Sequence, residues 1–277
     1  MTAYLNSSFD LSSPELISVL DEVPVWSAPF GLQLLDNIRF KSGMHVLDIG
    51  CGTGFPLTEI ALRLGKSCKI FGLDPWGAAL NRAHEKTRVY GLDNVELLQG
   101  KAEAIPLEDS SMDLITSNNG LNNVEDLKQS LSECYRVIRE GGQFLQTINL
   151  ETTMVEFYNV MEDVLKDRDM DEARNSMKQH IHEKRKPLRE YLEFIKDSGF
   201  TINELKHHQF QYKFADGTTM LNHYFIRMAF LDSWKKIVPV QKQEEIFLTI
   251  ESALNLRAGE NGYLPLTIPF VTIDCMG

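Results

Sequence analysis

The chain has little positive charge, few cysteines and no long apolar run, and each shortage excludes a class of protein. It holds 28 lysines and arginines against 39 aspartates and glutamates, for a formal net charge of -11. Nucleic-acid binding draws on dense basic patches, so no nucleic-acid partner is expected. The four cysteines, at positions 51, 68, 134 and 275, lack metal-binding spacing, which indicates reduced thiols and no metal site.

No stretch reaches ~18 consecutive apolar residues, and the most apolar one, YFIRMAFL, is interrupted by Arg227. The first twenty residues contain neither lysine nor arginine, so no secretory or transit peptide is expected. These features predict a cytoplasmic protein without stable membrane association. The length of 277 residues exceeds that of a bare doubly wound domain and predicts substantial insertions.

A glycine-rich turn follows an apolar run and an acid in the segment LDIGCGTGFP at Leu47–Pro56. The run Met44–Ile49 suits a strand that is buried on both faces. Gly50, Gly52 and Gly54 allow backbone angles and close approaches that side chains forbid. The segment therefore predicts a turn against which a ligand lies directly.

Two other nucleotide-binding turns fit this segment less well. No Lys-Ser or Lys-Thr pair follows the glycines, which excludes a phosphate-binding P-loop. The dinucleotide pattern G-x-G-x-x-G requires a third glycine where Phe55 or Leu57 stands. Asp48, at the mouth of the turn, would repel a pyrophosphate and attract an ammonium group. We therefore expect a ligand with an amine at this point.

A second acid stands at the end of the next predicted strand. The strand Lys69–Leu73 leads into Asp74, and Pro75 is a favourable first residue for a helix. An acid placed about 20 residues beyond the glycines can accept hydrogen bonds from both ribose hydroxyls. The expected ligand thus combines an amine with a nucleoside.

At these residues the sequence resembles the class I S-adenosyl-L-methionine-dependent methyltransferases, whose first motif is similar to LDIGCGTG and whose second is an acid such as Asp74. The resemblance covers roughly Met44–Ile148. It continues with VELLQGKAEAIPLEDSSMDLITSNNGLNN at Val95–Asn123 and CYRVIREGGQF at Cys134–Phe144. Within the family, GLNNVED and RVIREGG are most similar to the ubiquinone and menaquinone biosynthesis C-methyltransferases.

The resemblance implies a set of cofactor contacts. Asp48 would face the amino group, Asp74 the ribose, and Trp76 the adenine. Where the family often has an acid, this chain has Lys101, so the adenine contact stays open between the backbone of Ala102 and the carboxylate of Glu103. The full set is Asp48, Gly50, Cys51, Gly52, Thr53, Gly54, Asp74, Pro75, Trp76, Lys101, Ala102, Glu103, Ser117, Asn118 and Asn119.

Strands that alternate with helices predict an α/β fold with a doubly wound, mostly parallel, Rossmann-like sheet of seven strands. Helical insertions are expected after the fifth strand and between the sixth and seventh. Residues 1–150 would form N-terminal helices and the cofactor-binding core. Residues 151–277 would form a helical cap over the carboxyl edge of the sheet, together with the last strands. The predicted strands are Met44–Ile49, Lys69–Leu73, Val95–Leu98, Met112–Thr116, Gln143–Ile148, Thr201–Tyr212 and Leu264–Asp274.

Methyl transfer from a sulfonium is an in-line displacement, which requires a positioned acceptor and the exclusion of water. Large apolar side chains in the insertions have two interpretations. They could line a pocket for a small apolar or aromatic acceptor, or they could form the core of the insertions themselves. If the acceptor must lose a proton, a residue has to act as the base. The sequence does not identify it, and His207, His208 and His223 are its weak candidates. The apolar residues in question are Phe157, Tyr158, Tyr224, Phe225, Met228 and Trp234.

A charged segment lies between the two groups of insertions. His180, His182 and Glu183 lack the i, i+4 spacing of helical metal ligands, so we expect no metal there. The run Lys184–Lys186 is most simply a solvated helix end, and a phosphate or carboxylate clamp is the other interpretation.

Three functions follow in order of preference. The first is methyl transfer from S-adenosyl-L-methionine to a small molecule. The second is a non-catalytic module that binds this cofactor or its demethylated product and uses the insertions as a partner interface, with a homodimer as one arrangement. A nicotinamide-dependent enzyme is a distant third because of the glycine spacing.

Overall fold

The computed structural model describes residues 3–6, 8–22 and 25–277, and the chain forms two compact units. The core unit comprises residues 10–149, 187–208 and 270–277. The helical unit comprises the residues up to Phe9, residues 150–186 and residues 209–269. None of the helices in the described ranges combines the length and the apolar composition needed to cross a membrane.

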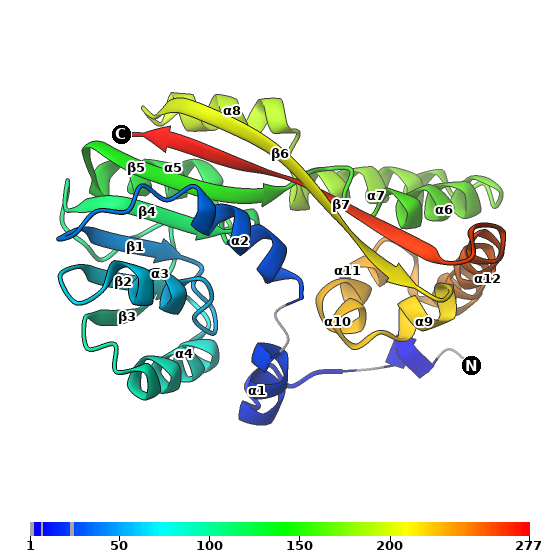
Figure 1. Ribbon diagram of the computed structural model, residues 1–277. Coiled ribbons are helices and arrows are strands. Elements are labelled where there is room, and N and C mark those ends of the chain that lie inside the picture. The colour runs from blue at the N-terminus through cyan, green and yellow to red at the C-terminus, as the bar shows by residue number, and fades with distance from the viewer. Residues whose placement is uncertain (1–2, 7, 23–24) are drawn as a thin grey trace. The chain divides into compact units, whose positions relative to one another are not determined.

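A seven-stranded sheet runs in the order β3-β2-β1-β4-β5-β7-β6 (Figure 1). Strands β1 to β5 pair in parallel, and β7 pairs with β5 in the antiparallel direction. This confirms the prediction of a mostly parallel, Rossmann-like sheet of seven strands. The strands are β1 (His45–Ile49), β2 (Lys69–Asp74), β3 (Val95–Gln99), β4 (Met112–Asn118), β5 (Ile138–Asn149), β6 (Thr201–Phe214) and β7 (Leu264–Met276).

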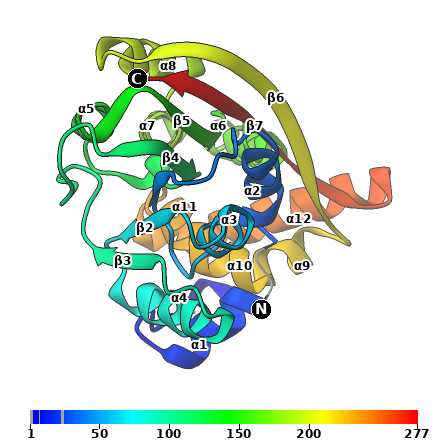
Figure 2. The ribbon, with the colours of Figure 1, turned by 60° about the vertical axis from the view of Figure 1, so that its left-hand side comes forward.

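Helices cover both faces of the parallel strands in the core unit (Figure 2). On one face, Val46, Leu114 and Leu145 share an apolar cluster with residues of α2 and α3. On the other, Phe144 lies 4.7 Å from the ring of Phe200, which follows α8. Because adjacent residues of a strand point to opposite faces, continuous apolar runs are needed here. The helices are α1 (Pro14–Glu22), α2 (Ser27–Asp36), α3 (Leu57–Leu64), α4 (Gly77–Tyr90), α5 (Leu127–Val137) and α8 (Leu188–Asp197).

The junction between α5 and β5 differs from its sequence pattern. The pattern of apolar residues up to Ile138, followed by Gly141, predicts one helix that ends at the glycine. Instead α5 ends at Val137 and Ile138 already pairs with Met112 of β4. Gly141, with φ of 75°, lies within β5, where the register to β4 shifts. Pairing with a distant strand thus overrides the local helical pattern.

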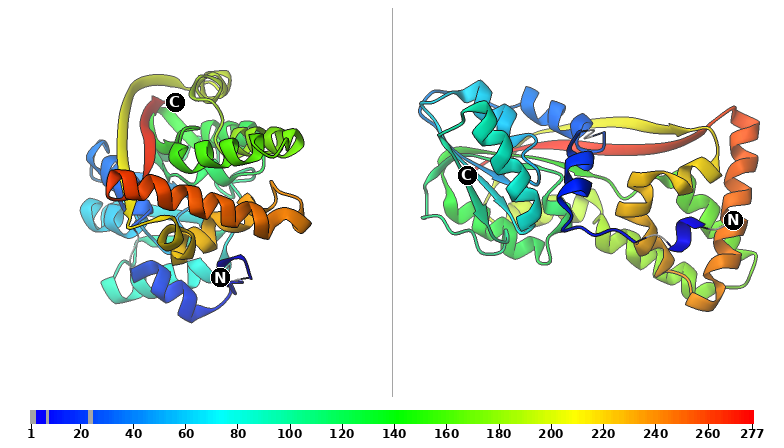
Figure 3. Two further views of the ribbon diagram at one scale, coloured as in Figure 1. Left: turned by 90° about the vertical axis from the view of Figure 1, so that its right-hand side faces the viewer. Right: turned by 90° about the horizontal axis from the view of Figure 1, so that it is seen from below.

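The helical unit is built from α6 (Val155–Lys166), α7 (Asp171–Lys184), α9 (Gly217–Asn222), α10 (Tyr224–Ile226), α11 (Asp232–Lys235) and α12 (Gln243–Asn261), and from the ends of β6 and β7 (Figure 3). A π-helix at Arg227–Leu231 joins α10 to α11. Helix α12 packs against α6 and α9. Its buried residues Ile246, Ile250 and Leu254 are four apart and so form one face.

Three of the large apolar side chains that the sequence offered as acceptor-pocket candidates, Phe157, Tyr158 and Trp234, form the core of this unit. The rings of Phe157 and Trp234 stack with their centroids 3.8 Å apart. The indole Nε1 of Trp234 donates a hydrogen bond of 3.0 Å to the hydroxyl of Tyr158. All three side chains are buried, whereas Tyr224 is 41% exposed. The interpretation as core therefore holds for Phe157, Tyr158 and Trp234.

The pair Asp216-Gly217 predicts a turn, but it begins a helix. The carboxylate of Asp216 accepts a hydrogen bond of 2.6 Å from the backbone N–H of Thr219 and so caps α9. The helical spacing of Leu221, Tyr224, Phe225, Met228 and Leu231 predicts one helix, but α9 ends at Asn222 and α10 begins at Tyr224. His223 between them has an extended backbone, with ψ of 131°.

Candidate cofactor site at the ends of the parallel strands

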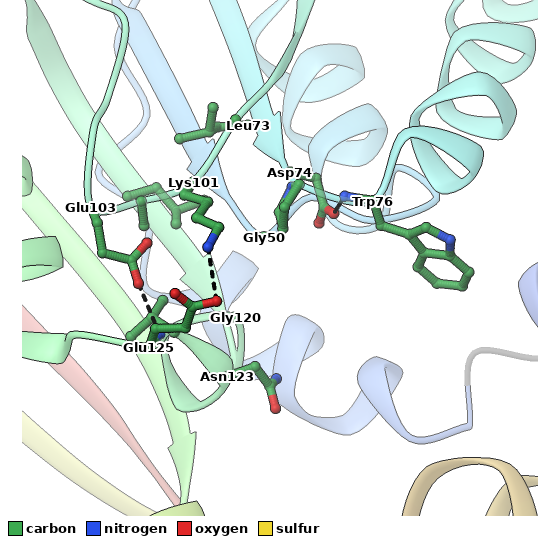
Figure 4. Close-up of a pocket in the computed structure, with 14 residues that line it drawn as sticks. Gly50, Leu73, Asp74, Trp76, Lys101, Glu103, Gly120, Asn123 and Glu125 are labelled. Atoms are coloured by element: carbon green, nitrogen blue, oxygen red, sulfur yellow. Dashed lines mark hydrogen bonds and ion pairs between the residues drawn. The ribbon is translucent and has the colours of Figure 1, made fainter. Parts of the chain in front are cut away.

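A cavity of about 330 Å³ lies at the carboxyl ends of β1, β2 and β4 in the core unit (Figure 4). This is the edge at which ligands bind in open α/β sheets. The lining residues come from the last residues of β1 and β2 and from the loops that follow β1, β2, β3 and β4. They are Ile49, Gly50, Leu73, Asp74, Pro75, Trp76, Gly100, Lys101, Ala102, Glu103, Gly120, Asn123, Val124 and Glu125.

The glycine turn after β1 brings two loops into close contact. Gly50 has φ of 72°, a region that residues with a side chain rarely adopt. A Cβ at Gly50 would lie 2.8 Å from the Cα of Gly120, in the loop after β4. The backbone N–H of Gly50 donates a hydrogen bond of 2.8 Å to the carbonyl of Leu73. Only glycine at position 50 therefore allows the loops after β1 and β4 to meet.

Asp74 ties the glycine turn to the start of the loop after β2. Its Oδ2 accepts a hydrogen bond of 2.8 Å from the N–H of Gly52, and its Oδ1 accepts one of 2.8 Å from the N–H of Trp76. Burial raises the pKa of this carboxyl above its usual value despite the two N–H donors, which lower it. Asp74 lines the cavity, and each of its oxygens has a second lone pair that these two hydrogen bonds do not use.

Asp48 lies beneath the turn, outside the set of residues that line the cavity. Its side chain is 1% exposed, and Oδ1 accepts a hydrogen bond of 2.7 Å from the hydroxyl of Thr116. Oδ2 is buried and has no hydrogen-bond partner within the part of the chain that the structure describes. Burial raises the pKa of Asp48 to about 7, and the nearby charge of Asp74 contributes in the same direction. Asp48 is thus a buried carboxylate with one oxygen that accepts no hydrogen bond from the described residues.

One ion pair and two hydrogen bonds to backbone N–H groups connect the loop after β3 to the loop after β4. Lys101 Nζ lies 2.8 Å from Oε1 of Glu125, which raises the pKa of the lysine through that hydrogen bond and charge. Oε1 of Glu103 accepts hydrogen bonds from the N–H groups of Glu125 (2.8 Å) and Asp126 (3.1 Å). Figure 4 shows these contacts joining the loops after β3 and β4. The lysine is therefore held by an acid of the next loop.

A family model described as a methyltransferase domain matches residues 40–251, which is more than half of the chain. The chain belongs to the methyltransferase-domain family. The family predicted from the sequence is thereby confirmed.

Curated relatives of this methyltransferase-domain protein match its sequence over a limited segment. The demethylmenaquinone methyltransferase of Listeria welshimeri is 40% identical over 106 residues, which is 38% of this chain and 45% of the relative. The demethylmenaquinone methyltransferase of Bacillus cytotoxicus is 34% identical over 120 residues, 43% of this chain and 51% of the relative. The chain thus spans about half the length of the curated relatives it matches.

Solved methyltransferase structures share the fold over more of the chain. One of them is described as a geranyl diphosphate methyltransferase in complex with GPP and sinefungin. The superposition covers 90% of this chain and 78% of the solved chain, with a TM-score of 0.55 and 18% sequence identity. At such identity the likeness shows the fold alone.

Seven of the sequence-predicted contact residues of this methyltransferase domain line the cavity. They are Gly50, Asp74, Pro75, Trp76, Lys101, Ala102 and Glu103. Gly52 and Gly54, with φ of 52° and 102°, shape the turn behind them, and Thr53 is half-buried between the two. Cys51 is 1% exposed, and burial raises the pKa of its thiol well above the usual value, which suits a space-filling role.

The predicted residues at the end of β4 make structural contacts. Ser117 Oγ donates to the carbonyl of Ile49 at 3.2 Å, and the amide of Asn118 donates to the carbonyl of Ser27 at 3.1 Å. Oδ1 of Asn119 accepts from the N–H of Asn149 at 3.2 Å. None of the three lines the cavity. Their predicted place beside a sulfonium stays a prediction.

The three candidate histidines also lie outside the residues that line the cavity. His208 stacks on Phe270 with ring centroids 4.9 Å apart, and its Nε2 lies 3.2 Å from Thr272 Oγ1. Its pKa is lowered by partial burial and by the charges of Lys206 and His207. His207 is exposed, and His223 packs edge-on against Phe214 in the helical unit. A catalytic role for any of them stays a prediction.

The sequence did not single out the loop after β4 as a wall of the site. Gly120, Asn123, Val124 and Glu125 all line the cavity. A signal was present, because the segment GLNNVED directly follows the predicted fourth strand and strand ends converge at one edge of the sheet. The pairing of Glu125 with Lys101 bridges 24 positions in the chain and required the structure.

Proposed function

We propose that the cavity binds S-adenosyl-L-methionine and that the protein transfers its methyl group to a small molecule. The observation that carries this proposal is the pair of buried carboxylates at the glycine turn. Asp48 has an oxygen without a donor among the described residues, and Asp74 has lone pairs at the cavity wall. A buried carboxylate is stabilised by a cationic donor, which an amino-acid tail supplies.

Each chemical group of the cofactor has a residue in this region that suits it. When bound, the cofactor supplies a methyl group on a positively charged sulfur. Asp48 would hold the ammonium group through Oδ2, and Asp74 would accept from the ribose hydroxyls while the N–H groups of Gly52 and Trp76 keep it in place. The three glycines of the turn, with positive φ, would let the methionine end lie against the backbone.

The charges of the cavity support a cationic ligand over a dinucleotide. Asp74, Glu103 and Glu125 line it, against a single Lys101 that is already ion-paired with Glu125. Such an excess of carboxylates favours a sulfonium and an ammonium and repels a pyrophosphate. We therefore favour the methyl-transfer cofactor over a nicotinamide dinucleotide.

For the adenine, we propose the backbone of Ala102 and the free oxygen of Glu103. Lys101 is unsuited to replace an acid, because its ammonium group has only donors and pairs with Glu125. Glu103 uses Oε1 for the N–H groups of Glu125 and Asp126, which fixes the carboxylate and leaves Oε2. A fixed acceptor at this point suits an exocyclic amino group.

We propose a small apolar or aromatic molecule as the acceptor. Support comes from the relatives named demethylmenaquinone methyltransferases, which match 38–43% of the chain and whose name points to an acceptor of quinone type. In an in-line displacement the protein orients the acceptor and excludes water, so an acceptor with a large apolar body suits the reaction.

Calorimetric titration of the purified protein with S-adenosyl-L-methionine, S-adenosylhomocysteine and NAD tests cofactor choice. We expect the first two to bind and NAD to give no heat, and binding of NAD alone would overturn the proposal. Methyl-labelled cofactor is then incubated with demethylmenaquinone and, separately, with a cell extract. Transfer of label to a small molecule supports the enzyme, whereas cofactor binding without transfer to anything supports the non-catalytic module.

A further inference from the structure

An ion pair joins two of the loops that line the cofactor cavity. Nζ of Lys101, in the loop after β3, lies 2.8 Å from Oε1 of Glu125, in the loop after β4, and both residues line the cavity (Figure 4). The two side chains are 55% and 79% exposed, so the pair is in contact with solvent. The cofactor contacts proposed above use neither of these two charges.

The strand that precedes Lys101 is the least buried of the parallel strands. β3 lies at the edge of the sheet and none of its residues is buried, whereas most residues of β1, β2 and β4 are. In the order β3-β2-β1-β4, three strand spacings separate β3 from β4, which is a distance of about 14 Å. The ion pair therefore connects the loop of an edge strand to a loop at the middle of the sheet.

The loop after β3 forms a turn with a free backbone donor. The backbone N–H of Ala104 donates a hydrogen bond of 3.2 Å to the carbonyl of Lys101, which closes a turn over residues 101–104. Ala102, within the turn, is 6% exposed and lines the cavity. Its backbone N–H donates to no group in the described part of the chain. Because most buried N–H groups have an acceptor, this one is available to a ligand in the cavity.

Ala102 stands between two residues that are both anchored on Glu125. On one side, the ammonium group of Lys101 pairs with the carboxylate of Glu125. On the other side, Oε1 of Glu103 accepts a hydrogen bond of 2.8 Å from the backbone N–H of Glu125 and one of 3.1 Å from that of Asp126. The backbone at Ala102 is therefore held through both of its neighbours, and the ion pair supplies one of the two anchors.

We propose that Lys101 and Glu125 are positioning residues, which hold the turn so that the backbone N–H of Ala102 and the carboxylate of Glu103 meet an adenine ring. The inference rests on the function proposed above. An ammonium group has donors only and cannot accept from the amino group of adenine, so Lys101 acts through the turn and not on the base itself. The ligand class that such a turn selects is a nucleoside with a 6-amino purine.

Two ligands that differ only at the base test this inference. They are S-adenosylhomocysteine and S-inosylhomocysteine, in which a ring N–H and a carbonyl replace the ring acceptor and the amino group of adenine. Calorimetric titration of the full chain gives the dissociation constant of each ligand. We expect the parent to prefer the adenosyl ligand by at least about tenfold, because the inosyl ligand presents a donor to the N–H of Ala102.

Breaking the ion pair should reduce this preference. In Lys101→Met and in Glu125→Gln we expect the preference to fall by about two- to fivefold, since an exposed pair is weak. A double variant that combines Lys101→Glu with Glu125→Lys restores opposite charges and should recover most of the preference. Glu96→Gln is the matched control, because Glu96 pairs with Lys69 at 3.4 Å, is similarly exposed and does not line the cavity. It should keep the full preference.

The melting temperature separates positioning from stability. All of these variants should melt close to the parent, because an exposed pair contributes little to stability. Lower melting temperatures with an unchanged preference would make the pair structural and overturn the inference. An equal loss of preference in Glu96→Gln would indicate a general charge effect, and a double variant no better than the single ones would show that the pairing does not matter. Either result also overturns the inference.

The same titrations distinguish this inference from the proposed function. If the parent binds neither ligand, the proposed function fails and the positioning role fails with it. If the parent prefers the adenosyl ligand and the variants of Lys101 and Glu125 keep the full preference, the positioning role alone fails.

Discussion

Thr116 donates a hydrogen bond of 2.7 Å from its hydroxyl to Oδ1 of Asp48, and the second oxygen of that buried carboxylate has no partner in the described part of the chain. Thr116 comes from β4 and Asp48 from β1, and the two residues are paired in the parallel register of these strands. The acid is therefore held by Thr116 through one oxygen, and its other oxygen is buried without a donor among the described residues. This arrangement leads to two predictions about pH.

The first prediction concerns the stability of the ligand-free protein. The pKa of Asp48 is about 7 when folded and about 3.8 when unfolded, so between these values the folded state binds more protons. Stability is then greatest below the unfolded pKa and is lost as pH rises through about 7, by up to about 4 kcal/mol. Asp48→Asn mimics the protonated acid and should remove this loss.

Urea unfolding of both proteins at about pH 5 and about pH 8 measures this effect. We expect Asp48→Asn to exceed the parent in stability by about 1–2 kcal/mol near pH 5 and by about 3–4 kcal/mol near pH 8. Asp93→Asn, at an exposed position, is the control and should change neither value. A variant less stable than the parent near pH 8 would contradict the assignment.

The second prediction concerns proton release on cofactor binding, and it depends on the proposed function. If an ammonium group meets Asp48, the bound state requires the ionised acid, so binding releases a proton below pH 7. Affinity for S-adenosylhomocysteine should then fall about tenfold per pH unit below about 7 and level off above it. Calorimetry in two buffers with different ionisation enthalpies counts the protons, and Asp48→Asn should release fewer.

The third prediction places Asp74 at the ribose. Asp74→Ala removes two acceptors and should weaken cofactor binding by about 1–3 kcal/mol, or roughly 5- to 150-fold. The loss includes the freed N–H groups of Gly52 and Trp76, which now donate to this carboxylate. Asp74→Asn keeps one oxygen and should lose less. An unchanged dissociation constant for Asp74→Ala would refute this placement.

The fourth prediction compares two glycines with positive φ. Gly43→Ala (φ 78°) and Gly50→Ala (φ 72°) both force a side chain into a disfavoured backbone region, at a cost of about 1–2 kcal/mol. Only at Gly50 would the new Cβ also meet a backbone atom, the Cα of Gly120 at 2.8 Å, whereas nothing lies within 4 Å at Gly43. Thermal unfolding should show a clearly larger loss for Gly50→Ala, and equal losses would contradict the close contact.

The fifth prediction tests the core of the helical unit. Trp234→Phe removes the indole N–H that donates to Tyr158 and leaves a small cavity beside Phe157, so we expect a loss of about 1–3 kcal/mol. Tyr158→Phe removes the acceptor of the same hydrogen bond. In a double-mutant cycle the combined loss should be smaller than the sum of the single losses. Additive losses would show that the two side chains do not interact.

Much of the core fold could be predicted because its signals are local. The observed strands β1 to β4 lie within two residues of the predicted ones, since a strand buried on both faces requires a continuous apolar run such as Met44–Ile49. The predictions failed where distant pairing decided the backbone. Ile138 joined β5 rather than α5 because it pairs with Met112, and Asp216 capped a helix rather than forming a turn.

The candidate site shows the same division. The sequence predicted that acids and glycines at the ends of strands, such as Asp74 and Gly50, belong to the site. This was possible because parallel strands bring their carboxyl ends to one edge of the sheet. The wall formed by Gly120 and Glu125 was missed, since it depends on contacts such as the ion pair of Glu125 with Lys101. Ser117, Asn118 and Asn119 make hydrogen bonds to other segments of the chain, which the sequence did not predict, and their place beside a sulfonium stays a prediction.

By itself the sequence determined the parallel sheet, the glycine turn with its two acids and the family, because these depend on residue type and short spacing along the chain. Only the tertiary structure decided which polar groups are satisfied. Asp48 and Arg185 look like ordinary charged residues in the sequence, and both are buried with atoms that lack a partner in the described structure. Burial and the absence of a counter-charge are properties of neighbours far apart in the chain, so no local pattern encodes them.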